Sequence, residues 1–450
     1  MSAFQIKTSS IEFISVAKLE TIEVPNEHSK AYISGLVLED HAKAIMTGKY
    51  LNSEISLTYV EDAMSPEIFF NGIINEISIK VYGQLYYADV HITSYTCLLD
   101  KSYKFRTFQD KNQTLKSVVR EIINNYNNAQ YICQGESANL GSFFVQYQET
   151  DWEFIKRMAA MRKKELYAEA RQPYIAFYVG LRADNNVKSN FSVPTFKMRE
   201  FEKDGLKYRE YELKTEQKFN FGSSVSFLNM ELVVHTKKMV IENQERYFLY
   251  TLRTKEACVI KAYKNQKIQG AICPASVVSI KRDRLQIAVK EDWGKEIKKR
   301  WFRYATVYSS PDGSGWYCMP EEGDQVYLYF PDCEEEEAYV LNAMHLEESE
   351  KRNDPEKKII RSKHKKEICF TPTEILLTNH KGTSIRLSDD KGIIIKTDKD
   401  IMVTSESGIV MSSKGGIKVS GQEGVVLKQK ANMLAVRNGI REHGERISHQ

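Results

Sequence analysis

The most regular hydrophobic pattern of the chain lies near its C-terminus, where apolar pairs recur every eight residues. Within each pair the residues are two positions apart, so in a strand both side chains point to one face. Turn-forming residues fill the rest of each repeat, and glycine or aspartate often precedes the pair, as at Gly392 and Asp400. We expect these pairs to form the core of a needle: Ile385 and Leu387, Ile393 and Ile395, Ile401 and Val403, Ile409 and Met411, Ile417 and Val419, and Val425 and Leu427.

Each eight-residue repeat supplies one short strand and one turn, which cannot enclose a core alone. Three repeats would make one coil of a monomeric β-helix, so the six repeats would give only two coils with open edges. Three intertwined chains would instead each supply one face of a triangular prism, which the apolar pairs would fill. We therefore predict a homotrimeric rod roughly 30 Å long, at about 4.7 Å per layer. A flat β-meander is the simpler alternative.

Two segments in the N-terminal half have the apolar spacing of amphipathic helices. The first starts near residues 112–114 and ends at Asn127 and Asn128. The second starts at a capping box, in which Thr150 binds the backbone of Glu153 and Glu153 reaches back. In that helix Trp152 and Phe154 have the spacing of core residues, which favours packing over a ligand-stacking role.

A strand-rich block at residues 268–345 predicts a small barrel. Its segment 320–324 is expected to be a turn in which Gly323 adopts a positive φ. The acidic run at residues 332–337 would repel phosphate, so we expect this barrel to bind no nucleic acid. We expect the run itself to be a solvated loop.

Taken in order, these segments resemble the VgrG (valine–glycine repeat G) proteins and the related hub and spike proteins of contractile phage tails and phage-tail-like particles. Residues 45–59 and 69–74 are similar to the first hub barrel of that family. The family's tyrosine-x-glutamate-Ser/Thr-aspartate-aromatic-x-phenylalanine line is matched by Tyr147, Glu149, Asp151, Trp152 and Phe154. The end of its OB-fold domain is matched by Pro320, Gly323 and Asp324.

The resemblance implies a mainly β chain with an α+β hub. This fold class comprises hub barrels with helical inserts, an OB-fold barrel and a C-terminal trimeric triangular β-helix of octad repeats. The expected domains are a first hub barrel (1–98), a helix-containing hub region (99–195), a second hub barrel (196–257), an OB-fold (258–345), a charged connector (346–372), a β-helix needle (373–435) and a polar tip or tail (436–450).

The resemblance also implies a structural role in a contractile injection system. The trimeric hub would sit on the end of an inner tube, and the needle would be driven through a target envelope when a sheath contracts. Expected partners are inner-tube and baseplate proteins and a Pro-Ala-Ala-Arg (PAAR)-type tip protein or an effector, with the target membrane met only on puncture. The chain would be made and assembled in the cytoplasm of the producing cell, within a particle or secretion apparatus that is released or acts extracellularly.

Composition and charge agree with several globular domains and exclude some classes of protein. The chain has 450 residues, 42% of them hydrophobic, and a formal net charge of +4. So small an excess of basic residues argues against a strongly basic nucleic-acid-binding protein. No run of 18 apolar residues exists, and the N-terminus lacks a signal-peptide pattern. The seven cysteines form no Cys-x-x-Cys pair, which argues against a zinc ribbon or a redox site.

The sequence shows none of the common catalytic motifs for peptide, ester or nucleotide chemistry. The expected connector, residues 346–372, is too short for an enzyme domain. We therefore expect no catalytic residue, no cofactor and no metal site, and we interpret His443 and His449 as parts of a flexible polar tail. Two alternatives remain open at this stage, a phage-tail-associated cell-wall-degrading enzyme and a trimeric receptor-binding fibre.

Overall fold

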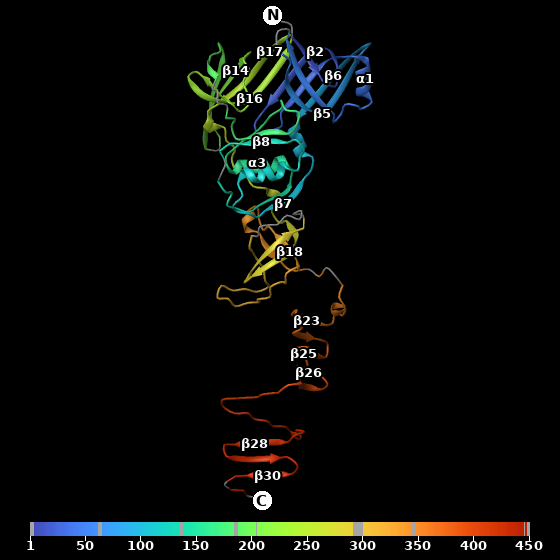
Figure 1. Ribbon diagram of the computed structural model, residues 1–450, viewed down its shortest axis with the longest axis vertical. Coiled ribbons are helices and arrows are strands. Elements are labelled where there is room, and N and C mark those ends of the chain that lie inside the picture. The colour runs from blue at the N-terminus through green and yellow to red at the C-terminus, as the bar shows by residue number, and fades with distance from the viewer. Residues whose placement is uncertain are drawn as a thin grey trace. The chain divides into compact units, whose positions relative to one another are not determined.

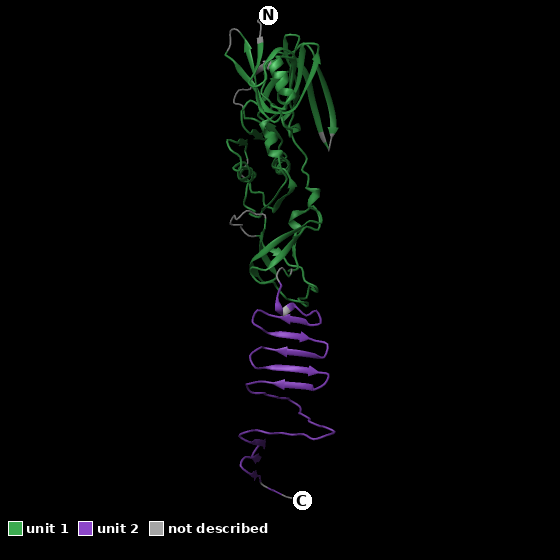
Figure 2. Ribbon diagram, turned by 90° about the vertical axis from the view of Figure 1, so that its right-hand side faces the viewer, with its two compact units in different colours: residues 1–346 green, residues 347–450 purple. Residues whose placement is uncertain are grey.

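The computed structural model of the chain divides into two compact units, residues 1–346 and 347–450 (Figure 2). The structure describes residues 4–61, 65–135, 138–183, 188–203, 205–290, 300–343, 345, 348–444 and 446–447. Among these residues no helix is both long and apolar enough to span a membrane.

A twelve-stranded sheet forms the N-terminal part of the first unit (Figure 1). Its order is β1-β4-β5-β6-β3-β2-β16-β17-β14-β13, and β12 and β15 join it through β16. The strands are β1 (Phe4–Thr8), β2 (Phe13–Glu23), β3 (Lys30–Val37), β4 (Glu54–Glu61), β5 (Glu67–Tyr82), β6 (Leu85–Ser94), β12 (Lys188–Phe191), β13 (Phe196–Lys203), β14 (Leu206–Thr215), β15 (Ser224–Phe227), β16 (Met230–Glu242) and β17 (Glu245–Arg253). Helix α1 (Glu39–Met46) and the 3-10 turn η2 (Lys255–Ala257) accompany them.

The two halves of this sheet meet where β2 pairs antiparallel with β16, with Leu19 opposite Ile241. Both of these side chains belong to one hydrophobic cluster, which also contains Ile33 from the first half and Leu252 from the second. The two halves of the sheet are therefore joined by shared hydrogen bonds and a shared core.

A helical region is inserted between the two halves of the sheet. It contains η1 (Tyr95–Asp100), β7 (Lys104–Phe108), α2 (Leu115–Ile123), β8 (Gln130–Cys133), β9 (Phe144–Glu149), α3 (Asp151–Met161), β10 (Leu166–Ala168) and β11 (Ala176–Val179). Both helices begin at capping boxes, with Thr114 and Thr150 as N-caps. Helix α2 ends at Ile123, earlier than predicted, because the Asn125 side chain donates to the carbonyls of Glu121 and Ile122 and closes the last turn.

An antiparallel five-stranded barrel follows, in the order β20-β19-β18-β21-β22. Its elements are η3 (Gln266–Ile268), β18 (Ile272–Lys281), β19 (Arg284–Val289), β20 (Phe302–Arg303), β21 (Gln325–Tyr329), η4 (Glu335–Glu337) and β22 (Tyr339–Leu341). As the alternation predicts, Val326, Leu328 and Phe330 are buried in its core.

The second unit consists of short antiparallel strands (Figure 2). After η5 (Glu350–Arg352) come β23 (Lys358–Arg361), β24 (Glu367–Phe370), β25 (Glu374–Thr378), β26 (Ser384–Ser388) and β27 (Gly392–Lys396), which pair in sequence order, and then β28 (Val425–Gln429), β29 (Asn432–Val436) and β30 (Ile440–His443). Residues 401–424 lie in no strand.

This arrangement differs from the uniform, intertwined β-helix expected from the octads. Within one chain the paired strands form antiparallel meanders, which is the simpler alternative considered above. The first sheet also begins inside the segment assigned to a charged connector, where Lys358 pairs with Phe370 and Ile360 with Ile368. An octad has the same pattern whether its neighbour strand comes from its own chain or from another copy.

Candidate functional site: the hub–barrel junction and the apolar face of the C-terminal sheet

Strand β9 contributes side chains to two hydrophobic cores at once. Phe144 packs in the cluster around helices α2 and α3, whereas its neighbours Phe143 and Val145 pack in the core of the barrel. The ring of Phe143 meets the ring of Phe302 edge-on, with centroids 5.4 Å apart. Because successive side chains of a strand point to opposite faces, this one segment joins the helical region to the barrel.

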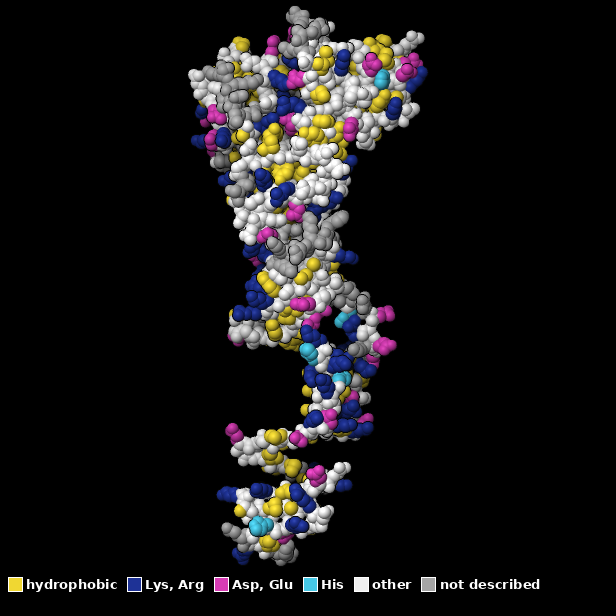
Figure 3. All heavy atoms as spheres, in the orientation of Figure 1, with side chains coloured by type: hydrophobic (Ala, Val, Ile, Leu, Met, Phe, Trp, Pro, Cys, Tyr) yellow, Lys and Arg dark blue, Asp and Glu magenta, His cyan; other side chains and the backbone are white. Residues whose placement is uncertain are grey.

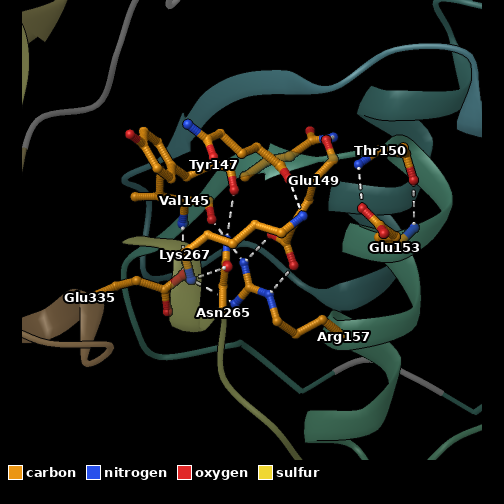
Figure 4. Close-up of polar contacts among 11 residues, drawn as sticks. Val145, Tyr147, Glu149, Thr150, Glu153, Arg157, Asn265, Lys267 and Glu335 are labelled. Carbon is orange, nitrogen blue, oxygen red and sulfur yellow. Dashed lines mark hydrogen bonds and ion pairs between the residues drawn. The ribbon is translucent and has the colours of Figure 1, made fainter. Parts of the chain in front are cut away.

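A buried arginine on α3 connects three segments of this junction (Figure 4). Arg157 donates from Nε and Nη2 to both carboxylate oxygens of Glu149, at 2.7 and 2.8 Å. Its Nη2 also donates to the carbonyl of Val145 at 2.8 Å, and its Nη1 to Oε1 of Glu335 at 3.1 Å. The guanidinium therefore pairs with the helical region and the barrel through charge-assisted, partly bidentate hydrogen bonds.

The acidic run at residues 332–337 takes part in this junction, so the prediction of a solvated loop was wrong. Oε1 of Glu335 accepts from the backbone N of Val145 at 3.2 Å as well as from Arg157. Oε1 of Glu336 accepts from the backbone N of Phe143 and from Oγ of Ser142, both at 2.7 Å. On the short turn η4 these carboxylates accept hydrogen bonds from amide and guanidinium donors. Those hydrogen bonds compensate the free-energy cost of removing the carboxylates from water.

Burial and pairing change the pKa values of these groups in different directions. Burial opposes the charged form of Arg157, but the hydrogen bond to Glu149 and the charge of Glu335 outweigh it and raise the arginine pKa. Burial raises the pKa of Glu335 against the opposing charge of Arg157. For Glu336 burial acts upward too, but the donors from Phe143, Ser142 and Arg300 lower its pKa. The junction therefore holds Arg157 charged at every physiological pH.

The remaining residues of the hub motif hold the helical region together. Asp151, at the start of α3, accepts from Tyr126 Oη at 2.6 Å and from Arg106 Nη2 at 3.3 Å. Trp152 is buried, and its Nε1 donates to the carbonyl of Asn26 at 3.3 Å. The ring of buried Phe154 stacks on Phe108, with centroids 5.1 Å apart. These contacts are structural, as the helical spacing predicted.

The backbone of the same motif binds the segment that leads into the barrel (Figure 4). The carbonyl of Tyr147 accepts from Nδ2 of Asn265 at 2.7 Å, and the carbonyl of Gln148 from Nζ of Lys267, also at 2.7 Å. Gln148 has a φ of 49°, which leaves its carbonyl outside the β7–β9 pairing. The motif line therefore contacts the barrel through both its side chains and its backbone.

The predicted barrel turn forms around Gly323, whose φ is 91°. The backbone N of Glu321 donates to Oδ2 of Asp324 at 2.8 Å, and the backbone N of Gly323 to the carbonyl of Val277 at 2.8 Å. The second of these hydrogen bonds joins the turn to β18, and we assign the turn a role in closing the barrel.

The first sheet of the second unit has one apolar face. In the register Ile375 lies opposite Leu387, and Leu387 opposite Ile393; Leu377, Ile385 and Ile395 form a second row. We call these two rows, together with Ile360, Ile368 and Phe370 on β23 and β24, the apolar face. The opposite face is mixed: Leu376 and Ile394 lie on either side of Arg386, and Arg386 also pairs with Glu374, with Nε and Oε2 3.3 Å apart.

The apolar face is open to solvent in the single chain. Ile385 is 40% exposed, Ile393 70% and Ile395 57%. Near the C-terminus, Leu427 and Leu434 lie opposite each other on β28 and β29 and are exposed as well. Figure 3 shows hydrophobic side chains on the surface of these C-terminal strands. Contiguous exposed apolar surface of this kind marks an interaction site.

Three of the predicted core pairs lie outside the sheets. Ile401 and Val403, Ile409 and Met411, and Ile417 and Val419 all fall in residues 401–424 and are more than half exposed.

The described residues contain no group of three or more His, Cys, Asp or Glu side chains placed to hold a metal ion. Of the two terminal histidines, His443 lies at the end of β30, and His449 falls outside the residues that the structure describes. A cavity at the junction, of about 150 Å³, is lined by Arg157, Tyr263 and Glu335 among others. The carboxylates of Glu335 and Glu336 in its lining accept from the donors described above, and that of Glu334 pairs with Lys264.

Two parts of the chain match known protein families. Residues 35–163 match the phage tail baseplate hub (GPD) family, and residues 273–345 match the type VI secretion system/phage-baseplate injector OB domain. The first match contains the hub motif, and the second contains the predicted barrel turn. No curated protein matches the sequence.

Solved structures show the same fold at low sequence identity. One is the E. coli c3393 protein, described as a component of the type VI secretion system with structural similarity to the T4 bacteriophage tail proteins gp27 and gp5. The TM-score is 0.55 at 13% identity, over 76% of this chain and 100% of that chain. Another is the half-lidded Francisella PdpA-VgrG complex, with a TM-score of 0.56 at 9% identity, over 88% of each chain. The chain is thus similar in fold to hub and spike proteins.

Proposed function

We propose that this chain is the structural central spike of a contractile injection system. One observation carries the proposal: a single chain contains, in order, a baseplate hub region, an injector OB domain and a series of short strands with an open apolar face. A protein that only binds the inner tube, or only punctures an envelope, would not need all three parts. The spike fixes the inner tube to a needle that punctures the target envelope.

The hub–barrel junction suits a part that must transmit force. The helical region and the barrel share strand β9, and the buried ion pair of Arg157 and Glu335 links them again. Hydrophobic packing and a buried charge pair thus couple the helical region to the barrel. Thrust applied to the hub therefore reaches the barrel without being absorbed by a hinge.

The apolar face supports assembly as a homotrimer. An isolated five-stranded sheet with one bare apolar face is unstable in water and prone to association. Three copies placed with these faces toward a common axis bury them together and form the prism of the needle. The predicted core pairs, from Ile385 to Leu427, then lie inside it.

The proposed partners follow from the same three parts. The hub binds inner-tube and baseplate proteins, and the needle carries a PAAR-type tip protein or an effector. The chain is assembled in the cytoplasm of the producing cell and acts outside it, on the target membrane. The proposed function includes no catalysis, because the segment between the barrel and the needle contributes β23 and β24 to the sheet instead of an enzyme domain.

The proposal is tested by purifying the tagged full-length chain from producing cells and identifying the proteins that accompany it. We expect tube and baseplate proteins, and a trimeric mass for the purified chain in native mass spectrometry. A variant that ends at residue 346 should keep the tube and baseplate proteins and lose the tip protein. Recovery of none of these proteins with the full chain would overturn the proposed function, as would digestion of peptidoglycan by the pure protein.

A further inference from the structure

A small pocket lies on the large sheet, beside the β2–β16 pairing that joins its two halves. Thr21 on β2 and Met239 on β16 are opposite each other in that pairing, and both line the pocket. The rings of Phe69 on β5 and Phe248 on β17 add apolar walls. The pocket has a volume of about 20 Å³, which is room for roughly one water-sized group.

Four cations line this pocket, which we call the cationic pocket: Arg171, Lys218, Lys237 and Arg246. They come from separate segments, since Lys237 lies on β16 and Arg246 on β17, whereas Arg171 follows β10 and Lys218 lies between β14 and β15. Of the described residues that line the pocket, one, Glu67, is a carboxylate. Like charges that are gathered beside apolar walls repel one another, and a low local dielectric constant strengthens the repulsion.

Each lysine of the cationic pocket has a carboxylate partner. Lys218 pairs with Glu67 at the pocket wall, and Nζ of Lys237 lies 2.5 Å from Oε2 of Glu23. The side chains of Lys237 and Glu23 are both largely buried. These two ion pairs compensate the charges of the lysines, but not those of the arginines.

The two arginines are compensated less completely. Nη2 of Arg171 is 2.8 Å from Oε2 of Glu169, but the same oxygen also pairs with Nη1 of Arg182 at 2.7 Å. The guanidinium of Arg246 lies over the ring of Tyr59, 4.1 Å from its centroid, and no carboxylate in the described part of the chain forms an ion pair with it. A cation–π contact replaces only part of a missing counter-ion. The cationic pocket therefore keeps positive charge that the described residues do not neutralise.

The ammonium group of Lys218 shows the effect of this surplus charge. Burial lowers its pKa, and the charges of Lys237 and Arg246 lower it further, while the charge of Glu23 opposes them. A nearby anion acts in the opposite direction and favours the charged amine. An anion bound in the cationic pocket would thus relieve a repulsion that the fold already contains.

We propose that the cationic pocket binds one carboxylate group. Its lysines and arginines supply charge-assisted donors, and its apolar walls suit the carbon stem to which a carboxylate is attached. The small volume admits the oxygen end of one carboxylate and is too small for a whole phosphate group. The inference requires neither the trimer nor the needle, so it can fail without affecting the proposed function.

Two sources carry this chemistry: an acidic side chain of a protein that docks on the large sheet, and a free small carboxylate. Both place the same group among the same donors. The experiments below first test the site itself with sodium acetate and then separate the two sources.

The first experiment uses the unmodified full-length protein and an amine-reactive N-hydroxysuccinimide ester, and mass spectrometry follows each lysine. Sodium acetate is compared with sodium chloride at equal ionic strength. We expect high acetate to slow the modification of Lys218 at least about fivefold relative to chloride, because a bound ligand protects in proportion to its saturation. Lys197, which is well exposed on β13, should react equally fast in both salts. Equal rates for Lys218 in the two salts would overturn the inference.

A pair of charge-neutralising variants tests whether the cations of the pocket are responsible. Arg246→Gln removes a cation without leaving a described carboxylate unpaired, so we expect a folded protein in which acetate no longer protects Lys218. Lys238→Gln is the matched control, because Lys238 is adjacent to Lys237 on β16 but pairs with Glu20 outside the pocket. Loss of protection in both variants would indicate a general effect of net charge and would contradict the site.

A capped tripeptide with one central glutamate distinguishes the sources. Protection of Lys218 at a peptide concentration about tenfold lower than that of acetate would support the site and identify a protein side chain as its ligand. Equal potency of peptide and acetate would support the site and identify a free small carboxylate. If neither protects Lys218, the inference is wrong, whereas the proposed spike is still judged by the proteins that accompany the chain.

Discussion

Arg157 shows how much of the molecule can depend on one buried charge. Its guanidinium binds Glu149, Glu335 and the carbonyl of Val145, and only 2% of its side chain is exposed. Removing one partner of such a pair leaves the other charge buried without compensation. The residue therefore matters to the junction even though a neutral, well-packed replacement of the whole cluster would be tolerated.

Replacing this arginine should destabilise the first unit. We expect Arg157→Leu to lower the free energy of unfolding by about 3–5 kcal/mol, because Glu149 and Glu335 lose their shared cation. The matched control is Arg303→Leu, since Arg303 pairs with Glu337 where both side chains are more than half exposed. That change should cost less than about 1 kcal/mol. Urea unfolding measures both, and equal losses would contradict the role assigned to the buried pair.

A second buried carboxylate predicts how stability depends on pH. Glu169 accepts from Nη2 of Arg171 at 2.8 Å and from Nη1 of Arg182 at 2.7 Å. Burial acts to raise its pKa, but the two guanidinium groups prevail and lower it to about 2. Because this pKa lies below the value in the unfolded chain, the stabilisation is present above about pH 4.5 and is lost as the pH falls toward 2.

This contribution is on the order of 3 kcal/mol at neutral pH. We expect the wild-type protein to lose more stability than Glu169→Gln between pH 7 and pH 3, as followed by urea unfolding at each pH. Glu200→Gln serves as the control, because Glu200 forms an exposed pair with Arg209. If Glu169→Gln loses as much stability as the wild type between pH 7 and pH 3, groups other than Glu169 take up the protons that destabilise the protein.

Residues 401–424 include two neighbouring side chains with opposite expected orientations. Ile409 belongs to an apolar pair, and Val410 lies between the members of that pair and is 91% exposed. Ile409→Asp would place three carboxylates in the dry prism and should cost several kcal/mol per site, which blocks trimer formation. Val410→Asp should leave the trimer intact. Light scattering distinguishes the outcomes, and a stable trimer of Ile409→Asp would refute the inward assignment.

At the scale of elements, β9 and the residue before it, Phe143, unite two cores. Phe143 and Phe144 are adjacent, nearly fully buried, and belong to different clusters. Removal of either buried ring leaves a cavity that the surrounding core cannot fully close. Each truncation to alanine should therefore lower the free energy of unfolding by about 3–5 kcal/mol. The two truncations differ in which hydrophobic core they destabilise.

The two truncations should therefore separate in hydrogen exchange. We expect Phe143→Ala to accelerate exchange first in β18 and β21 of the barrel, and Phe144→Ala to accelerate it first in α2 and α3. The matched positions make each variant the control for the other. Identical exchange maps for the two variants would mean that the clusters behave as a single core.

At the scale of the whole molecule, local patterns predicted the elements better than the contacts between them. The capping box of Thr150 and Glu153, the turn at Gly323 and the buried alternation from Val326 all depend on near neighbours, and they form as predicted. The mainly β fold, the hub region and the OB barrel were also predicted correctly. Each of these features is determined by residues a few positions apart.

The parts that sequence reasoning missed depend on residues far apart. Glu335 lies 178 positions from Arg157, and an acidic run has the same pattern in a solvated loop as at a junction. A charged residue on the otherwise apolar side of α3 was the one available signal. The octads likewise do not reveal whether a strand pairs within its chain or with another copy.

Because β9 contributes to two cores, the position at which this protein can be joined to part of a relative is restricted. A chimera that takes the barrel from a relative and the helical region from this chain would combine a foreign barrel core with Phe143 and Val145, and would separate Glu335 from Arg157. Fusions made near residue 270 should thus yield insoluble protein unless residues 142–157 travel with the barrel. A cut between residues 346 and 347, where the compact units divide, is the better place to exchange one needle for another.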